Sequence, residues 1–324
     1  MRFADLEVFV RVVQEGTFSA AARVLGLTQP AVSARIAYLE RELNTTLLIR
    51  EPRRMYPTPE GMILYEHGLR ALAELHSAQQ RIQEESGRPS GSFVLCAGEA
   101  SGTTIAPLLL ASFRRLHPQV VPKLRVGSVA SNLNQVLEHE AGLAIVPYPP
   151  VEPRIEAVEL CRDEFRLIVP EGHPLAQDEP VDPHELVKYP FLTREKGSRA
   201  NALIERALAE LGVRFADVQV AMEMANSEAL KLAVSEGVGI AFIPQLCLHR
   251  PGHHQSGFRA VEVRGLSIKR GFYLIRSANA VHPYVERLFW EHCQDPEMLR
   301  QVAARYRLDL PDWLARRPGG SNSF

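Results

Sequence analysis

The chain has 324 residues, of which 46% are hydrophobic and 23% are charged, and its formal net charge is −1. This length predicts two or three domains, and this composition excludes a disordered or fibrous protein. Because the chain is almost neutral, a nucleic-acid partner would need a local basic surface. The sequence has no apolar run of 18 residues and no signal-peptide pattern at its N-terminus, so we expect a cytoplasmic protein without a membrane span.

The cysteines and histidines show no metal-binding spacing. The cysteines are scattered along the chain, at Cys96, Cys161, Cys247 and Cys293. None forms a CxxC pair, and His253-His254 have no cysteine or acid at ligand spacing. We therefore expect reduced thiols, no metal site and no cofactor.

Residues 1–58 show a helical pattern in three segments. The apolar positions of the first helix are Leu6, Phe9, Val10 and Val13, and Gly16 ends it. Ser19 is predicted to cap a second helix that ends at Gly26. Thr28 is predicted to cap a third helix that continues to about Leu43. Two helices joined by a short glycine-containing turn are typical of a helix-turn-helix.

The third helix begins with Gln29 and Pro30. A proline inside a helix costs about 3 kcal/mol, but the first-turn amides have no intrahelical partner, so Pro30 is tolerated there. The predicted apolar stripe of this helix is Val32, Ile36, Leu39 and Leu43. The other side carries mostly small or polar residues, namely Pro30, Ser33, Ala34, Ala37, Tyr38 and Arg41. Such a face can approach a grooved partner closely.

The segment "LLIREPRRMYPT" predicts a strand, a basic turn and a second strand, which together form a wing. Residues 1–58 contain eight basic and six acidic residues, and three of the basic ones, Arg50, Arg53 and Arg54, cluster at the wing. Clustered arginines suit contacts with phosphate or the minor groove, and a solvated surface is the alternative.

Thr58-Pro59-Glu60 predicts the start of a long helix that runs to about Glu85. Four residues at spacings of three and four resemble a dimerisation seam, namely Met62, Tyr65, Leu69 and Leu72. The alternative is a helix that packs on its own chain. Residues 86–91 ("SGRPSG") predict a flexible boundary.

From Ser92 onward, strands and helices alternate, which predicts α/β architecture with parallel strands. We expect a winged helix-turn-helix domain over 1–58 and a linker helix over 59–86. Residues 92–164 with 268–292 are predicted to form one lobe of a two-lobed α/β domain, and 165–267 the other. Residues 293–324 are a C-terminal extension whose end is expected to be disordered.

Residues 3–61 resemble the DNA-binding domain of LysR-type transcriptional regulators. The matching positions are Leu6, Phe9, Gly16, Phe18, Ser19, Ala21, Ala22, Leu25, Thr28 to Ser33, Ile36, Leu39, Glu40, Leu43, Leu47, Arg50, Thr58 and Gly61. The segments "HPLA" (173–176), "REKGSRA" (194–200) and "SEGVGIAFIP" (235–244) fit the family more loosely. The resemblance implies a winged helix-turn-helix, a linker helix used for dimerisation, and a two-lobed effector domain of periplasmic-binding-protein type. It also implies a homotetramer on promoter DNA and a small coinducer, although the sequence leaves dimer and tetramer open.

The resemblance implies that the start of the third helix and the wing contact DNA. The residues concerned are Thr28, Gln29, Pro30, Ser33, Arg35, Arg50, Arg53 and Arg54. Ala34 departs from the family, in which a long polar or basic residue is frequent. An alanine can at most touch a thymine methyl group, so the bases that this protein reads are open.

Two glycine-containing turns are candidates for the effector cleft. "GEASGTT" (98–104) and "EKGSRA" (195–200) each precede a predicted helix, and helix N-termini attract anions. The candidate contacts are Ser101, Thr103, Gly197, Ser198 and Arg199, with Asn132 and Tyr148 as weaker ones. Ordinary helix capping is the alternative for each hydroxyl.

The sequence thus predicts a DNA-binding transcriptional regulator without catalytic activity, controlled by a small anionic effector between two lobes. One alternative is a winged-helix module fused to an α/β enzyme, although the chain has no GxSxG, P-loop or GxGxxG motif. The other is an architectural DNA-binding protein that needs no effector.

Overall fold

A computed structural model describes residues 2–51, 54–85, 89–177, 179–195, 197–248, 257–280 and 282–315. The chain divides into two compact units, one made of Met1–Gly91 and Asn279–Arg287, the other of Ser92–Ala278 and Leu288–Phe324. Among the described helices, none combines the length and apolar character that crossing a bilayer requires.

The first unit begins with three helices: α1 (Phe3–Glu15), α2 (Phe18–Leu25) and α3 (Gln29–Leu43). Gly16 ends α1 in the left-handed conformation, with φ 69°, as expected. The cap of α2 is Thr17, because its side chain accepts a hydrogen bond from the Ala20 amide; the prediction of Ser19 is wrong. Thr28 caps α3 by accepting from the Ala31 amide, so Pro30 lies in the first turn as predicted.

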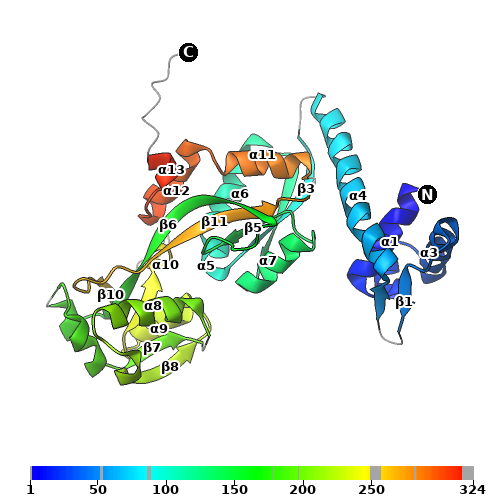
Figure 1. Cartoon of the computed structure of the whole chain (residues 1–324). Helices are drawn as coiled ribbons and strands as arrows, with labels where there is room; N and C mark the ends of the chain where they lie inside the picture. The colour runs from blue at the N-terminus through cyan, green and yellow to red at the C-terminus, as the bar shows by residue number, and fades with distance from the viewer. Residues whose placement is uncertain are drawn as a thin grey trace, which may run out of the picture. The chain divides into compact units, whose positions relative to one another are not determined.

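The wing is an antiparallel pair of strands, β1 (Leu48–Arg50) and β2 (Met55–Pro57), which confirms its prediction. The long helix α4 (Pro59–Glu85) follows directly (Figure 1). Thr58 caps it, with its Oγ1 accepting from the Gly61 amide at 2.9 Å. Gly61 itself packs so tightly against the Leu47 carbonyl that a Cβ there would overlap it.

The helices of this unit enclose one apolar core. Val32, Ile36 and Leu39 of α3 are fully buried in it beside Phe9 of α1. Leu43 is 41% exposed, so its place in the predicted stripe is wrong. The helix ends there, at Asn44, and no longer lies over the core.

The second unit contains a seven-stranded sheet and a two-stranded sheet. The strands of the large sheet are β3 (Gly91–Ala97), β4 (Val120–Val126), β5 (Leu143–Val146), β6 (Ile155–Pro170), β9 (Ala241–Pro244), β10 (Phe258–Val261) and β11 (Lys269–Ser277). They lie in the order β10-β6-β11-β5-β3-β4, and β9 pairs with β6. The small sheet pairs β7 (Phe191–Arg194) with β8 (Val220–Met224).

The expectation of parallel strands is correct only in part. β3 pairs with β5, and β7 with β8, in the parallel sense. β6 pairs antiparallel with β9, β10 and β11, and β11 pairs antiparallel with β5. β10 and the first half of β6 had no sequence-based prediction. The sheet is mixed because β6 and β11 run in opposite directions between two α/β halves.

Helices cover these sheets. They are α5 (Glu99–Thr103), α6 (Ile105–Leu116), α7 (Val129–Leu137), α8 (Arg199–Glu210), α9 (Ser227–Ser235), α10 (Gln245–Leu248), α11 (Tyr284–His292), α12 (Pro296–Tyr306) and α13 (Asp312–Ala315). Three short 3-10 helices span Pro174–Ala176, Pro183–Lys188 and Phe215–Asp217. The segment predicted as the turn "GEASGTT" is itself mostly helical, because α5 occupies it.

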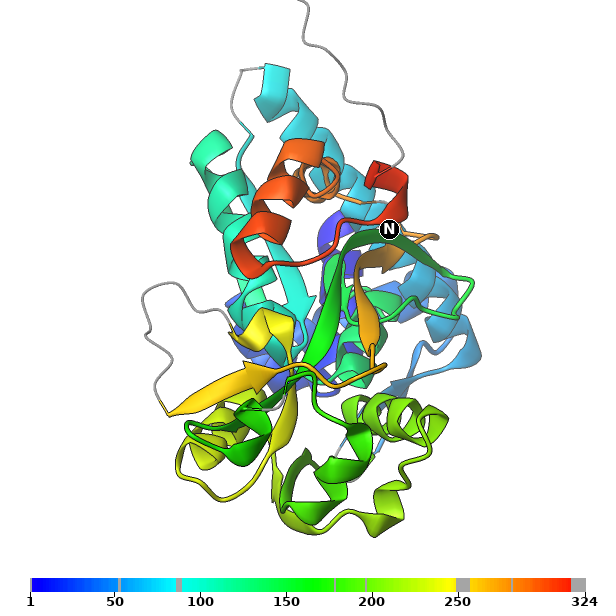
Figure 2. The same cartoon turned by 90° about the vertical axis from the view of Figure 1, so that its left-hand side faces the viewer.

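Two lobes are joined through β6 and β11, which lie side by side over most of their length (Figure 2). Lobe 1 contains β3, β4, β5 and α5 to α7, and lobe 2 contains β7 to β10 and α8 to α10. The predicted boundary at 164/165 falls inside the continuous strand β6. Each lobe has its own apolar core, with Phe191, Leu208 and Ile240 in lobe 2. In lobe 1, Phe93 and Phe113 pack edge to face, with ring centroids 6.0 Å apart.

The C-terminal extension folds into α12 and α13, which had no sequence-based prediction. Met298, Leu299, Val302 and Tyr306 of α12 are buried. The expectation of a disordered end concerns residues 316–324, which lie outside the described residues.

The close approach at Gly61 gives a prediction for stability. Substitution Gly61→Ala should destabilise the winged-helix unit by about 1–3 kcal/mol, because the added methyl group displaces the Leu47 carbonyl. Urea unfolding of the full chain, followed by amide exchange in α1 to α3, measures this change. Glu60→Ala is the matched control on the adjacent exposed position and should change stability by less than about 0.5 kcal/mol. Equal stability of both variants would contradict the prediction.

Candidate functional site

The exposed face of α3 is the candidate nucleic-acid interface. Gln29, Pro30, Ala34 and Tyr38 are exposed, and Ser33 is half-buried beside them. The spacing of 30, 34 and 38 places these residues along one face of the helix, opposite the buried Val32 and Ile36. Gln29 is held loosely, since its Oε1 accepts from the Ser19 hydroxyl at 3.5 Å. The side chains at the start of α3 are therefore free to reach the edges of bases.

The predicted basic contacts differ from one another in their geometry. Arg35 Nη1 donates to the Ala4 carbonyl of α1 at 3.2 Å, so in this conformation its guanidinium is directed toward α1, and a DNA contact for Arg35 stays a prediction. Arg54 is exposed, with its guanidinium 5.8 Å from the Tyr56 ring centroid. Arg50 ends β1. The Arg50 side chain and the whole of Arg53 lie outside the described residues.

Three of the four predicted dimerisation residues contact their own chain instead. Tyr65 is buried in the core of the first unit, and Leu69 and Leu72 pack against that core, because α4 lies over α1. Only Met62 is exposed, by 42%. The other exposed large apolar residues of α4 in the described part are Ile63, Leu75 and Ile82.

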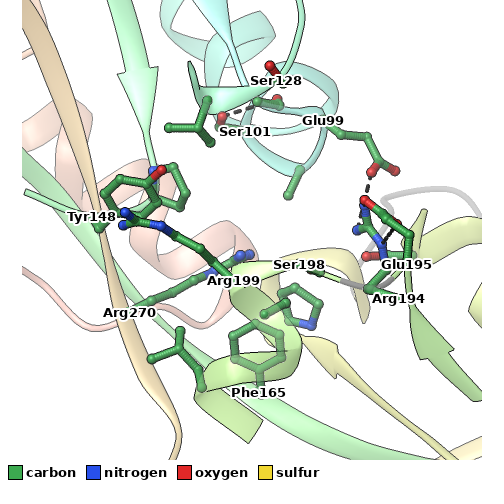
Figure 3. A pocket seen from close by; sticks show the side chains of 18 of the residues that line it. Glu99, Ser101, Ser128, Tyr148, Phe165, Arg194, Glu195, Ser198, Arg199 and Arg270 are labelled. Atoms are coloured by element: carbon green, nitrogen blue, oxygen red, sulfur yellow. Dashed lines mark hydrogen bonds and ion pairs between the residues drawn. The ribbon is translucent and has the colours of Figure 1, made fainter. Parts of the chain in front are cut away.

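A cavity of about 350 Å³ lies between the two lobes of the second unit (Figure 3). Lobe 1 lines it with Ser101, Ser128 and Glu99, and lobe 2 with Ser198 and Arg194. Phe165, Arg270 and Phe272 of the strands that join the lobes line it as well. Its volume is in the usual range for small-molecule sites.

Three helices of lobes 1 and 2 begin at this cavity. Ser128, Ser198 and Ser227 line it, and they stand at the N-termini of α7, α8 and α9. Ser128 caps α7, because its Oγ accepts from the Ser131 amide at 3.2 Å. Ser198 makes no side-chain cap bond. The helix dipoles therefore direct partial positive charge toward the cavity from both lobes.

Arg199 extends across the cavity from α8 to lobe 1. Its guanidinium lies 3.8 Å from the centroid of the Tyr148 ring, which is a cation–π contact between the lobes. Within the described part of the chain, Arg199 has no ion pair. Its guanidinium rests on an aromatic ring and the residue is exposed, so an anion can bind it without displacing a carboxylate of the described residues.

A second inter-lobe contact is the ion pair between Arg194 and Glu99, at 3.5 Å. Burial raises the pKa of the Glu99 carboxyl above its usual range, and the Arg194 charge opposes that shift. Arg194 also pairs with Glu195 at 3.2 Å. This arginine is thus already engaged by carboxylates, unlike Arg199.

Arg270 forms the third charged contact of the cavity. Its Nη2 lies 3.1 Å from Asp163 Oδ2, and Asp163 is fully buried. The guanidinium lies between two rings, 4.9 Å from the Phe165 centroid and 4.8 Å from that of Phe272. Burial raises the pKa of the Asp163 carboxyl, and the neighbouring Arg270 opposes this. Arg270 is therefore held rigidly at the wall of the cavity.

The cavity brings together five of the seven predicted effector residues: Ser101, Tyr148, Gly197, Ser198 and Arg199. Thr103 and Asn132 are outside its lining, so the structure gives their predicted effector contact no support and it stays a prediction. Thr103 is exposed on α5, and its hydroxyl donates to the Glu99 carbonyl at 3.0 Å. Asn132 is fully buried in α7, and its Nδ2 donates to the Gly127 carbonyl at 3.4 Å behind the cavity wall.

Sequence reasoning missed Glu99, Arg194 and Arg270. Glu99 lies inside the first turn that it selected and Arg194 directly before the second, after the carboxyl end of β3 and at that of β7. Ligands of α/β proteins bind at the carboxyl ends of the strands, so this position in the sequence could have identified both residues. Arg270 gave no such signal, because it begins a late strand. Among the described residues, no group of histidines, cysteines or acids could hold a metal ion.

Comparison with known protein families gives two matches along the chain. Residues 3–62 match the family described as "Bacterial regulatory helix-turn-helix protein, lysR family", which covers α1 to the start of α4. Residues 86–296 match "LysR substrate binding domain", which covers both lobes.

Relatives and solved structures agree with these matches. A probable RuBisCO transcriptional regulator of Emiliania huxleyi is 32% identical over 242 residues, or 74% of this chain and 77% of the relative. Another, of Trichormus variabilis, is 28% identical over 95% of this chain and 89% of the relative.

The fold is similar to that of a full-length OxyR variant from Pseudomonas aeruginosa, with a TM-score of 0.69, 17% identity and coverage of 91% of this chain and 98% of that one. It is also similar to full-length CbnR in complex with its target DNA, with a TM-score of 0.57, 20% identity and coverage of 94% and 100%. Because the helix-turn-helix model matches residues 3–62 and the substrate-binding model matches residues 86–296, this chain belongs to the LysR family of transcriptional regulators.

Proposed function

We propose that this regulator responds to a small organic anion, a carboxylate in the first instance, bound in the cavity between the lobes. The observation that carries the proposal is Arg199, whose guanidinium rests on the Tyr148 ring and has no ion pair in the described part of the chain. An anion can bind this guanidinium without displacing a carboxylate. Arg194 and Arg270 offer no such opening, since each is held by an acid.

The polar groups around Arg199 support the same class of ligand. The amides at the start of α7 and α8 face the cavity, and the Ser198 hydroxyl is not used for capping. Such N-terminal amides and a neighbouring guanidinium are the groups that bind carboxylates and phosphates. Apolar residues, including Phe165 and Leu203, line the remainder and suit a short carbon skeleton.

Ligand binding at this position gives a route to regulation. Arg199 and Ser198 belong to lobe 2, and Ser101 and Ser128 belong to lobe 1. A ligand that contacts both sets favours the arrangement of lobes in which both sets reach it. The effector thereby biases the DNA-binding arrangement of the assembly through a coupling free energy, with no chemical step. The lack of GxSxG, P-loop and GxGxxG patterns supports binding rather than catalysis.

At the DNA, we propose that Gln29, Pro30 and Ser33 of α3 contact base edges and that the wing arginines contact phosphate. The exposed apolar residues of α4, Met62 and Ile63 among them, support self-association through that helix. The proposed assembly is a dimer of dimers. A purely architectural role is less well supported, because an architectural DNA-binding protein needs no ligand-sized cavity between its lobes.

The first prediction concerns effector binding. Arg199→Ala should weaken the binding of the best carboxylate of a panel by about 10- to 100-fold, since a hydrogen bond to a charged group contributes about 1.5–3 kcal/mol. Isothermal titration calorimetry of the full chain measures this change. Arg206→Ala is the matched control, because Arg206 is an exposed arginine of the same helix, paired with Glu210 and outside the cavity. If only neutral or cationic compounds bind, the proposal fails.

The second prediction concerns base preference. Ala34→Arg should change the preferred base at one or two operator positions by about 1–3 kcal/mol, because a long side chain then reaches base edges from α3. Selection of bound sequences from a random DNA pool measures this preference. Ala4→Arg adds the same charge on α1 and should raise affinity without changing the selected sequence. The same selected site for Ala34→Arg and the unmodified chain would refute the expectation.

The third prediction separates the candidate functions. A gel shift on DNA from upstream of the chain's own coding sequence should give a complex whose mobility or affinity changes when the best-bound carboxylate is added. A complex that ignores every carboxylate would favour the architectural alternative. If no complex forms under any condition, both the effector-controlled regulator and the architectural DNA-binding protein are excluded.

A further inference from the structure

The connection between the lobes has two faces, and each is held by a different set of residues. Asp163 of β6 and Arg270 of β11 are direct register partners, next to the point where β6 leaves lobe 1. Their ion pair lies on the cavity side, because Arg270 lines the cavity. Their neighbours Arg162 and Lys269 point to the opposite face, since side chains alternate along a strand.

The C-terminal extension holds this opposite face. The Arg162 guanidinium forms two hydrogen bonds with Asp312, with Nη1–Oδ1 at 2.7 Å and Nη2–Oδ2 at 2.8 Å. Lys269 Nζ lies 3.1 Å from Asp309 Oδ2. The backbones of Arg162 and Asp309 exchange two hydrogen bonds, of 2.8 and 3.0 Å. The extension thus contacts both of the strands that join the lobes.

The Arg162–Asp312 contact is the most specific of these. The hydrogen bonds that the Arg162 guanidinium donates to the carboxylates of Asp312 and Glu159 raise its pKa. Glu159 is itself tied to the extension, because the Trp313 indole Nε1 donates to its carbonyl at 2.9 Å. Asp312 and Trp313 of α13 therefore hold two positions on one side of β6.

The extension also contacts both lobes. Helix α12 packs against α6 of lobe 1, against β6, and against α10 of lobe 2. Figures 1 and 2 show α12 and α13 beside β6. The Leu246 amide of α10 donates to Asp163 Oδ1 at 3.0 Å, so α10 contacts the extension and the buried pair at the cavity wall. Rotation of lobe 2 against lobe 1 would change the contact of α12 with α10, while Arg162 and Lys269 hold the extension on the strands that join the lobes.

We propose that residues 293–315 control the relative movement of the two lobes by fixing the outer face of the β6–β11 connection. The extension restricts the range of lobe arrangements and so sets how far the effector cavity opens. Its contacts with Arg162, Lys269 and α10 add resistance to rotation that β6 and β11 alone would not provide. The extension has this role in the ligand-free chain, so the proposal does not depend on the anion proposed above.

The test measures the separation of the lobes in the full chain without effector. Spin labels on Glu138→Cys in lobe 1 and Glu205→Cys in lobe 2 report this separation, since both positions are exposed. The four native cysteines are buried, and burial raises the pKa of each thiol, so they react slowly with the label. Asp312→Ala should broaden the measured distance distribution. It should also speed exchange of the Arg162 and Asp309 amides by about tenfold or more.

Two further variants make the result decisive. Asp217→Ala breaks an exposed two-bond pair with Arg214 in lobe 2, far from the extension, and should leave both measurements unchanged. Trp313→Phe removes the indole N–H and keeps a smaller aromatic ring at this half-buried position, so it tests the contact to Glu159 by a milder change if Asp312→Ala unfolds. An unchanged distribution and unchanged amide exchange in Asp312→Ala or, if that variant unfolds, in Trp313→Phe would overturn the proposal.

Discussion

The pairing of β6 with β11 is the contact on which the effector unit depends. These strands are the connection through which lobe 1 continues into lobe 2, and they are hydrogen-bonded from Ser277 and Ile155 at one end to Lys269 and Glu164 at the other. Antiparallel pairing keeps the two strands in fixed register while the sheet can still twist. The lobes can therefore move relative to each other while the pairing of β6 with β11 is kept.

The chemistry of the cavity follows from this arrangement. Each lobe is an α/β unit, so its helices begin at the carboxyl ends of its parallel strands, and these ends face the other lobe. Positive helix ends and small hydroxyl side chains consequently collect between the lobes. The charged residues that face them divide into two kinds: Arg194 and Arg270 are neutralised by acids and maintain the architecture, whereas Arg199 is balanced by a ring.

Local sequence signals predicted much of this structure, and the errors have a common cause. Thr28, Gly16 and Thr58 act on the backbone within a few residues, so their roles could be deduced without knowing the fold. Tyr65 has the same spacing on a dimerisation face as on a core face, and only the position of α1 decides between them. Thr103 lies inside the first selected turn and Asn132 follows Ser128 in α7, but neither lines the cavity, because side-chain direction depends on where α5 and α7 begin. Arg270 and the C-terminal helices depend on partners more than 100 residues away, such as Asp163 and Arg162.

The exposed position of Ala34 has a consequence for the history of such regulators. Ala34 lies on the solvent side of α3, opposite the buried residues Val32 and Ile36, so its identity contributes little to the packing of the unit. If α3 contacts bases as proposed, a single codon change there alters the promoters that are recognised and leaves the buried residues of the unit unchanged. Duplicated copies of the gene would then diverge in their target genes through this one position, without a change in the second unit.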